Sequence, residues 1–206
     1  MLEVNNVCVS FRSERQEKIF GTARNQVLFD VSLKVSQGTC LGILGESGSG
    51  KSTLGRVICG LLKPDTGEVK IQDVSVYASR NGRKNLQKRL SVVFQDYTTS
   101  ANPRFRVKEI IAEGLAARER NQKIRLNRLE EINRLLELVG LNSSYANRYP
   151  HELSGGQLQR VCIARAVACQ PEIILFDEAI SSLDAHTQIQ IMDLLHDRSE
   201  EHTSEL

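Results

Sequence analysis

The sequence predicts an α/β fold built around a parallel core sheet, and two apolar runs support this prediction. The first, Leu41-Gly-Ile-Leu44, leads into a glycine-rich loop, which a helix-compatible stretch from Thr53 to Leu62 follows. The second, over residues 172–176, ends in Asp177 and Glu178. A short apolar run that ends in acidic residues is typical of a buried parallel strand, whose carboxyl end opens on a ligand crevice.

The remaining elements follow from alternation, helical periodicity and turn residues. Two segments near the N-terminus read as strands of an antiparallel edge sheet, joined by a polar stretch from Arg12 to Asn25. The turn Lys63-Pro-Asp-Thr-Gly67 precedes a further strand, and the charges over 118–125 indicate a solvated helix face. The expected strands are 2–11, 28–36, 39–45, 67–76 and 90–95, and the expected helical stretches are 53–62, 107–139 and 157–168.

Residues 45–52 fit a phosphate-binding pattern of Gly, four residues and Gly-Lys-Ser, in the strand–loop–helix context that this P-loop pattern requires. The glycines let backbone N–H groups turn inward, and the helix N-terminus adds partial positive charge. Lys51 can reach the β- and γ-phosphates, and the Ser52 hydroxyl can ligate Mg²⁺. The sequence thus predicts a P-loop NTPase fold with a nucleoside triphosphate site. Its predicted residues are Gly45, Glu46, Ser47, Gly48, Ser49, Gly50, Lys51, Ser52 and Thr53.

The two carboxylates at the end of the second apolar run have distinct predicted roles. Asp177 suits a contact to Mg²⁺, and Glu178 faces differently, so it can polarise a water in line with the γ-phosphate. Adjacent acids are also common in solvated loops. The presence of the P-loop favours the catalytic interpretation.

A third segment, Leu153-Ser-Gly-Gly-Gln157, precedes a stretch with helical apolar spacing. Ser154 is a good N-cap for that helix, and the N–H groups that follow it point outward toward an anion.

Together these segments resemble the ATP-binding subunits of ABC transporters, from about Leu2 to about Leu195. Gln95 matches the Q-loop of that family, and Asp184 matches its D-loop, with Ser182 where Ala is more usual. The five residues that match the ABC signature are Leu153, Ser154, Gly155, Gly156 and Gln157.

The resemblance implies an ATP site shared between two subunits. The anion at the signature turn would be the γ-phosphate held by the P-loop of a second ATPase subunit, either identical or related. Gln95 would help to hold Mg²⁺, and its loop would contact membrane permease subunits. A helical subdomain would span about 96–160. Phe11 would stack on the adenine, with plain packing as the alternative.

Composition limits the function classes. The 206 residues are 40% apolar and 25% charged, which suits one sizeable core. The net charge of +2 and the absence of Trp give no argument for nucleic-acid binding. No apolar run approaches the roughly 20 residues that span a bilayer, so we expect a peripheral protein on the cytoplasmic face of the membrane. The five cysteines lack Cys-x-x-Cys spacing and predict small buried hydrophobes.

The resemblance also implies strands and a "switch" His after the D-loop, which the remaining residues do not supply. We therefore expect a truncated nucleotide-binding domain over residues 1–197, without the C-terminal strands, and a tail of artefactual origin over 198–206. An ordinary charged tail is the alternative. A non-catalytic nucleotide-binding fragment is the alternative function.

Residues 94–104 and 148–160 resemble the peptide/nickel importer branch, and residues 178–184 resemble most the nickel-type subunit. The implied activity is ATP hydrolysis that drives import of Ni²⁺, as a small chelate, or of di- or oligopeptides, with nickel favoured. An extracytoplasmic solute-binding protein would bind that cargo. DNA-repair ABC ATPases would need a long coiled coil between Gln95 and Ser154, and translation-type ABC proteins would carry two cassettes.

Overall fold

The computed structural model describes residues 1–17 and 22–177. They divide into two compact units, with the boundary after Gln87, and each unit is described by itself.

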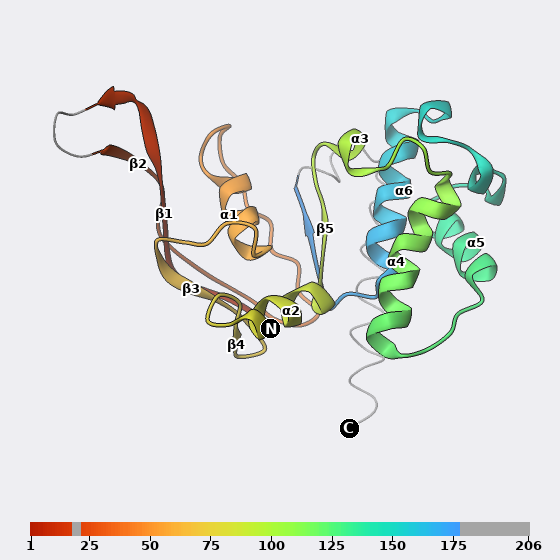
Figure 1. Ribbon diagram of the computed structural model, residues 1–206, viewed down its shortest axis with the longest axis horizontal. Coiled ribbons are helices and arrows are strands. Elements are labelled where there is room, and N and C mark those ends of the chain that lie inside the picture. Colours follow the sequence, from red (N-terminus) through yellow and green to blue (C-terminus); the bar gives the residue numbers. More distant parts are fainter. Residues whose placement is uncertain (18–21, 178–206) are drawn as a thin grey trace. The chain divides into compact units, whose positions relative to one another are not determined.

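The first unit contains an antiparallel sheet with the strand order β2-β1-β3-β4 (Figure 1). The strands are β1 (Leu2–Glu17), β2 (Thr22–Val35), β3 (Thr66–Ile71) and β4 (Val74–Ser75). Val4, Val7 and Val9 of β1 are buried, and irregular register between them shifts the inward-facing positions from even to odd numbers. The predicted antiparallel edge sheet is therefore present, and its strands extend into the polar stretch that was expected to join them.

The predicted strand over 67–76 is in fact a short hairpin. Gln72 and Asp73 have φ of 48° and 63°, so the chain turns back after β3 and pairs Ile71 with Val74. Such left-handed conformations are typical of turns. At the start of β3, Gly67 has φ of 82°, and a side chain there would collide with the Asn6 carbonyl oxygen.

Helix α1 (Lys51–Ile58) buries Leu54, Val57 and Ile58, and its last turn is held from outside the helix. The Tyr77 hydroxyl lies at hydrogen-bond distance from the carbonyl oxygens of Val57 and Leu62. Val57 belongs to the last turn of α1, whose carbonyls have no partner within the helix, and Leu62 lies beyond it. Burial raises the pKa of Tyr77 to about 12, so the phenol remains a donor at neutral pH.

Helix α2 (Arg80–Arg89) was not predicted, because its sequence is strongly polar and has no apolar periodicity. Within it, only Gly82 and Leu86 are buried.

The expected strand over 39–45 is not formed. Residues Cys40–Ser47 carry no regular structure, and Leu41, Ile43 and Leu44 are 47%, 45% and 96% exposed. A parallel strand needs neighbours on its edges, and among the described residues no strand pairs with this run. Cys40 is consequently exposed, contrary to the expected burial of the cysteines, whereas Cys162 is buried as expected.

The second unit contains a parallel pair of strands, β5 (Leu90–Val93) and β6 (Ile173–Phe176). Leu90 pairs with Ile173 and Val93 with Phe176. The run over 172–176 is thus a parallel strand as predicted, and the strand expected over 90–95 is its neighbour; both are shorter than expected.

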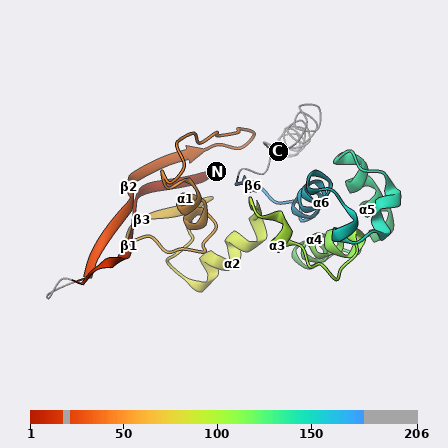
Figure 2. The ribbon, with the colours of Figure 1, turned by 90° about the horizontal axis from the view of Figure 1, so that it is seen from above.

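Helices form most of the remaining described part of this unit, around a core that includes the fully buried Ile110, Ile111, Leu115, Leu136 and Ile163. Helix α6 packs against both α4 and α5 (Figure 2). The α4–α6 contact is so close that a side chain at Gly114 would collide with the Arg165 carbonyl oxygen. The helices are α3 (Tyr97–Ser100), α4 (Val107–Gln122), α5 (Arg128–Leu138) and α6 (Gly155–Ala168), with short 3₁₀ helices η1 (Ser143–Asn147) and η2 (Pro150–Glu152).

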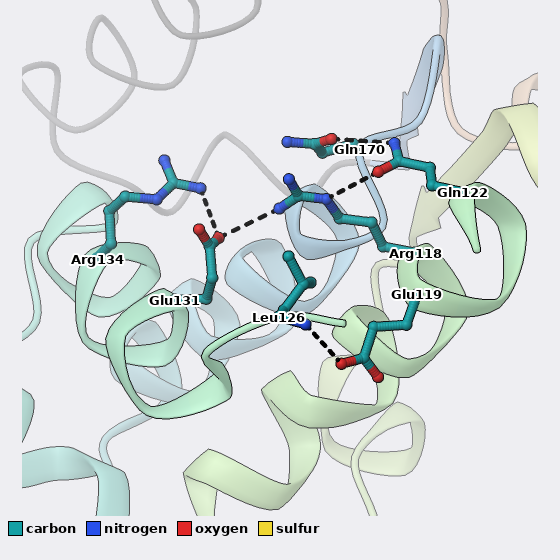
Figure 3. A network of polar contacts seen from close by, with 7 residues as sticks. All are labelled: Arg118, Glu119, Gln122, Leu126, Glu131, Arg134 and Gln170. Atoms are coloured by element: carbon teal, nitrogen blue, oxygen red, sulfur yellow. Dashed lines mark hydrogen bonds and ion pairs between the residues drawn. The ribbon is translucent and has the colours of Figure 1, made fainter. Parts of the chain in front are cut away.

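The helical stretch expected over 107–139 is divided into α4 and α5 by a turn, where Lys123 has φ of 57°. Polar contacts fix this turn (Figure 3). The Glu119 carboxylate accepts a hydrogen bond of 3.1 Å from the Leu126 N–H. Arg118 of α4 reaches Glu131 of α5 at 3.2 Å. The charges that looked like a solvated face therefore also connect the two helices. Among the described residues, no helix is long and apolar enough to cross a membrane.

Candidate nucleotide site

The loop before α1 has the conformation that the glycine spacing predicts. Gly48 and Gly50 have φ of 82° and 95°, a region that favours glycine. At Gly50 a Cβ atom would lie 2.8 Å from Leu28 Cδ2 and 3.1 Å from the Val27 carbonyl oxygen. At Gly45 a Cβ atom would lie 2.8 Å from Ser49 Oγ. The loop therefore closes tightly on itself and on β2 only because these positions lack side chains.

The Lys51 side chain folds back over this loop. Its Nζ atom donates hydrogen bonds of 2.7 Å to the carbonyl oxygens of both Gly45 and Glu46. The ammonium group is thus held at the loop, beside the N-terminus of α1, where Gly50 is the N-cap. A cation and a helix N-terminus together favour an anionic group of the phosphate type.

Phe11 lies on β1 opposite Asn25 of β2, and it is 41% exposed. Its ring is therefore accessible to solvent, and its stacking on adenine stays a prediction.

Gln95 and Asp177 follow the paired strands β5 and β6 of the second unit. The Asp177 N–H donates to the Val93 carbonyl oxygen at 2.9 Å, and Val93 pairs with Phe176. Gln95 follows β5 by two residues, so both predicted metal ligands lie at the carboxyl ends of adjacent parallel strands. Glu178 and Asp184 lie outside the described residues, as does the tail over 198–206.

Ser154 caps α6 through a reciprocal pair of hydrogen bonds. Its Oγ accepts from the Gln157 N–H at 3.3 Å, and Gln157 Oε1 accepts from the Ser154 N–H at 3.0 Å. This capping box satisfies two backbone donors and leaves the N–H groups of Gly155 and Gly156 at the start of the helix. Ser154 and Gly155 are exposed, and Gly156 is partly exposed.

Gly156 differs from Gly50 of the loop before α1. A Cβ atom built there meets nothing within 4 Å, and its φ is not in the left-handed region. The fold of this unit therefore does not require glycine at position 156.

The match to the family model described as ABC transporter spans residues 28–181. The chain belongs to the ABC transporter family. The predicted ABC ATPase fold is confirmed by a solved structure, the dimeric post-hydrolysis state of the ATP-binding cassette MJ0796 bound to ADP and Pi. That structure matches with a TM-score of 0.81 and 31% identity, over 98% of this chain and 84% of the other.

Curated ABC relatives place the chain in the peptide/nickel importer branch, as predicted. It is 44% identical over 174 residues to the oligopeptide transport ATP-binding protein OppF of Bacillus subtilis (strain 168). The aligned residues cover 84% of this chain and 57% of that protein. It is 39% identical over 196 residues to the nickel import ATP-binding protein NikE of Brucella suis, over 95% of this chain and 72% of that protein. The chain thus spans little more than half the length of the first relative.

The side chains assigned to the metal suit it chemically. Ser52, Gln95 and Asp177 all offer oxygen donors, the ligand type that Mg²⁺ prefers. Ser52 belongs to the first unit, and the other two belong to the second.

Two contacts of the ABC signature helix were missed by sequence reasoning. Gln157 Nε2 donates to the Tyr145 hydroxyl at 3.1 Å, and Arg165 donates to the Ser100 carbonyl oxygen at 2.7 Å. The second bond joins α6 to the segment that follows Gln95. Neither contact has a local sequence signal, since 12 and 65 residues separate the partners.

Proposed function

We propose that this chain is the ATP-binding and ATP-hydrolysing subunit of an ABC import system. The observation that carries this proposal is the glycine-formed loop around the Lys51 ammonium, in a chain of the ABC transporter family. A loop of this shape stabilises phosphate charge without any catalytic group of its own. Binding and hydrolysis of a nucleoside triphosphate are therefore the activities that fit it best.

Each predicted site residue has a separate role in ATP binding or hydrolysis. Lys51 and the N–H groups of the 45–50 loop neutralise phosphate charge, and Phe11 stacks on the base. Ser52, Gln95 and Asp177 hold Mg²⁺, which supplies positive charge against the β- and γ-phosphates. Glu178 orients and polarises the attacking water. The Ser154 turn, from a second ATPase subunit, donates to the γ-phosphate from the opposite side, and Asp184 lies in the adjoining D-loop.

The cargo is a di- or oligopeptide or a small nickel chelate. The names of two relatives, oligopeptide transport and nickel import, support this pair of classes equally. We propose that permease subunits carry the cargo through the membrane and that an extracytoplasmic solute-binding protein delivers it. This chain then acts at the cytoplasmic face and drives permeases through the segment after Gln95.

The proposal is tested by phosphate release and nucleotide affinity in the wild type, Lys51→Ala and Glu178→Gln. Lys51→Ala should weaken MgATP binding by about tenfold or more, because a charge-assisted hydrogen bond contributes about 1.5–3 kcal/mol. Glu178→Gln should retain affinity and lose turnover by about 10²–10⁴-fold, the usual contribution of general base catalysis. Undiminished turnover in Glu178→Gln removes that residue from its role. Unchanged affinity in Lys51→Ala contradicts the phosphate loop.

A further inference from the structure

We propose that Tyr145 is a positioning residue for the signature turn, the segment Leu153–Gln157. It lies outside the signature motif and does not contact nucleotide in this account. The inference rests on the proposed function, in which the turn of one subunit binds the γ-phosphate held by another.

A continuous chain of hydrogen bonds leads from Tyr145 to the turn. The Tyr145 hydroxyl accepts from Gln157 Nε2 at 3.1 Å, and Gln157 Oε1 accepts from the Ser154 N–H at 3.0 Å. Ser154 Oγ accepts in turn from the Gln157 N–H at 3.3 Å. Because Ser154 Oγ uses a lone pair in this bond, its own proton remains available for an anion.

Tyr145 is itself held in place. It is half-buried in η1, where the Arg148 N–H donates to its carbonyl oxygen at 3.0 Å. The Arg148 guanidinium carbon lies 4.1 Å from the centre of the Tyr145 ring, within the range of a cation–π interaction. The Arg148 carbonyl oxygen accepts from the Val107 N–H at 2.9 Å, which ties this segment to the start of α4.

These contacts decide the orientation of the Gln157 amide. An amide group has an acceptor end and a donor end, and the capping box needs the acceptor end toward the Ser154 N–H. Tyr145 gives the donor end a partner in that same orientation. Without the hydroxyl, the amide can rotate and the cap at Ser154 weakens. A second subunit would then have to order the turn when it binds, and ordering weakens association.

The matched variants are Tyr145→Phe and Tyr149→Phe. The first keeps the ring under Arg148 and removes the hydroxyl that Gln157 contacts. The second makes the same chemical change at a neighbouring ring, which stacks on His151 at 5.6 Å between centroids. Both variants are made in the wild type and in a Glu178→Gln background that retains ATP.

Three quantities are measured: amide hydrogen exchange over residues 153–158, MgATP affinity of the single chain, and the dissociation constant of the ATP-dependent dimer by sedimentation. Tyr145→Phe should speed exchange and weaken the dimer by about threefold to tenfold, the effect of one neutral hydrogen bond. Its melting temperature and MgATP affinity should match those of Tyr149→Phe. This combination supports a positioning role, since a purely structural role would lower the melting temperature first.

The outcomes separate this inference from the function on which it rests. If the Glu178→Gln chain forms an ATP-dependent dimer and Tyr145→Phe leaves both exchange and dimerisation unchanged, the positioning role is overturned and the proposed function stands. If Tyr149→Phe weakens the dimer equally, the role of Tyr145 is likewise overturned. If no variant dimerises with ATP, the shared-site function fails, and the inference fails with it.

Discussion

The phosphate loop (residues 45–51) and the signature turn (residues 153–157) are alike in sequence but are maintained by different forces. Both are rich in Gly and Ser and both precede a helix. In the phosphate loop, Gly48 and Gly50 adopt left-handed conformations, and Gly50 has no room for a side chain. In the signature turn, Gly156 has an ordinary φ and open space. Glycine is thus required by the chain's own fold in the first case and not in the second.

The side chains show the same contrast. Lys51 bonds to carbonyl oxygens of its own loop, whereas the signature turn is held by Gln157 and, through it, by Tyr145 of η1. The phosphate loop is shaped by backbone conformation, and the signature turn is shaped by side-chain hydrogen bonds. In the proposed function, the γ-phosphate of a second subunit's nucleotide approaches the backbone at Gly156, where a side chain would intrude.

The largest expected effect on stability is at Gly50. Gly50→Ala should lower the free energy of unfolding by about 1–2 kcal/mol for the left-handed conformation alone, with the contact to Leu28 adding to that cost. Urea unfolding measures this difference. Gly42→Ala is the matched control, since a Cβ atom there meets nothing within 4 Å. Equal free energies of unfolding for Gly50→Ala and Gly42→Ala would contradict the claim that the fold requires glycine at position 50.

At Gly156 we expect substitution to affect ATP turnover and not stability. Gly156→Ala should leave the free energy of unfolding unchanged or raise it by up to about 1 kcal/mol, because alanine favours a helix. If the signature turn binds the phosphate as proposed, ATP turnover should fall by about tenfold or more, because the added methyl group would disrupt a charge-assisted hydrogen bond worth about 1.5–3 kcal/mol. Parallel unfolding and phosphate-release measurements separate the two effects. Lost stability with normal turnover would reverse our interpretation of this glycine.

Local patterns in the sequence predicted the phosphate loop, the strands β1, β2, β5 and β6, and the N-cap at Ser154. Each depends on neighbours within a few residues or on an apolar run of characteristic length. The predictions failed where the secondary structure of a segment depends on distant parts of the chain. The run over 40–47 lacks a strand partner among the described residues, and Gln72 and Asp73 form a turn that polar residues alone did not reveal.

Long-range contacts could not be predicted from the sequence either. The hydrogen bond between Tyr145 and Gln157 joins η1 to α6, and that between Arg165 and Ser100 joins α6 to the segment after Gln95. No spacing rule relates these pairs. The motif residues could therefore be found from the sequence, but the residues that hold them could not.

The claim that one ATP lies between the P-loop of one chain and the Ser154 turn of another is tested most directly by photocrosslinking in a mixture. Unlabelled wild type is combined with isotopically heavy Lys51→Ala, and an ATP analogue with a photoreactive group on the γ-phosphate is added. Heavy chains hold little nucleotide themselves, so we predict crosslinks on the heavy peptide containing residues 153–157, and only when wild type is present. Crosslinks confined to the light chain's own peptides would contradict the account.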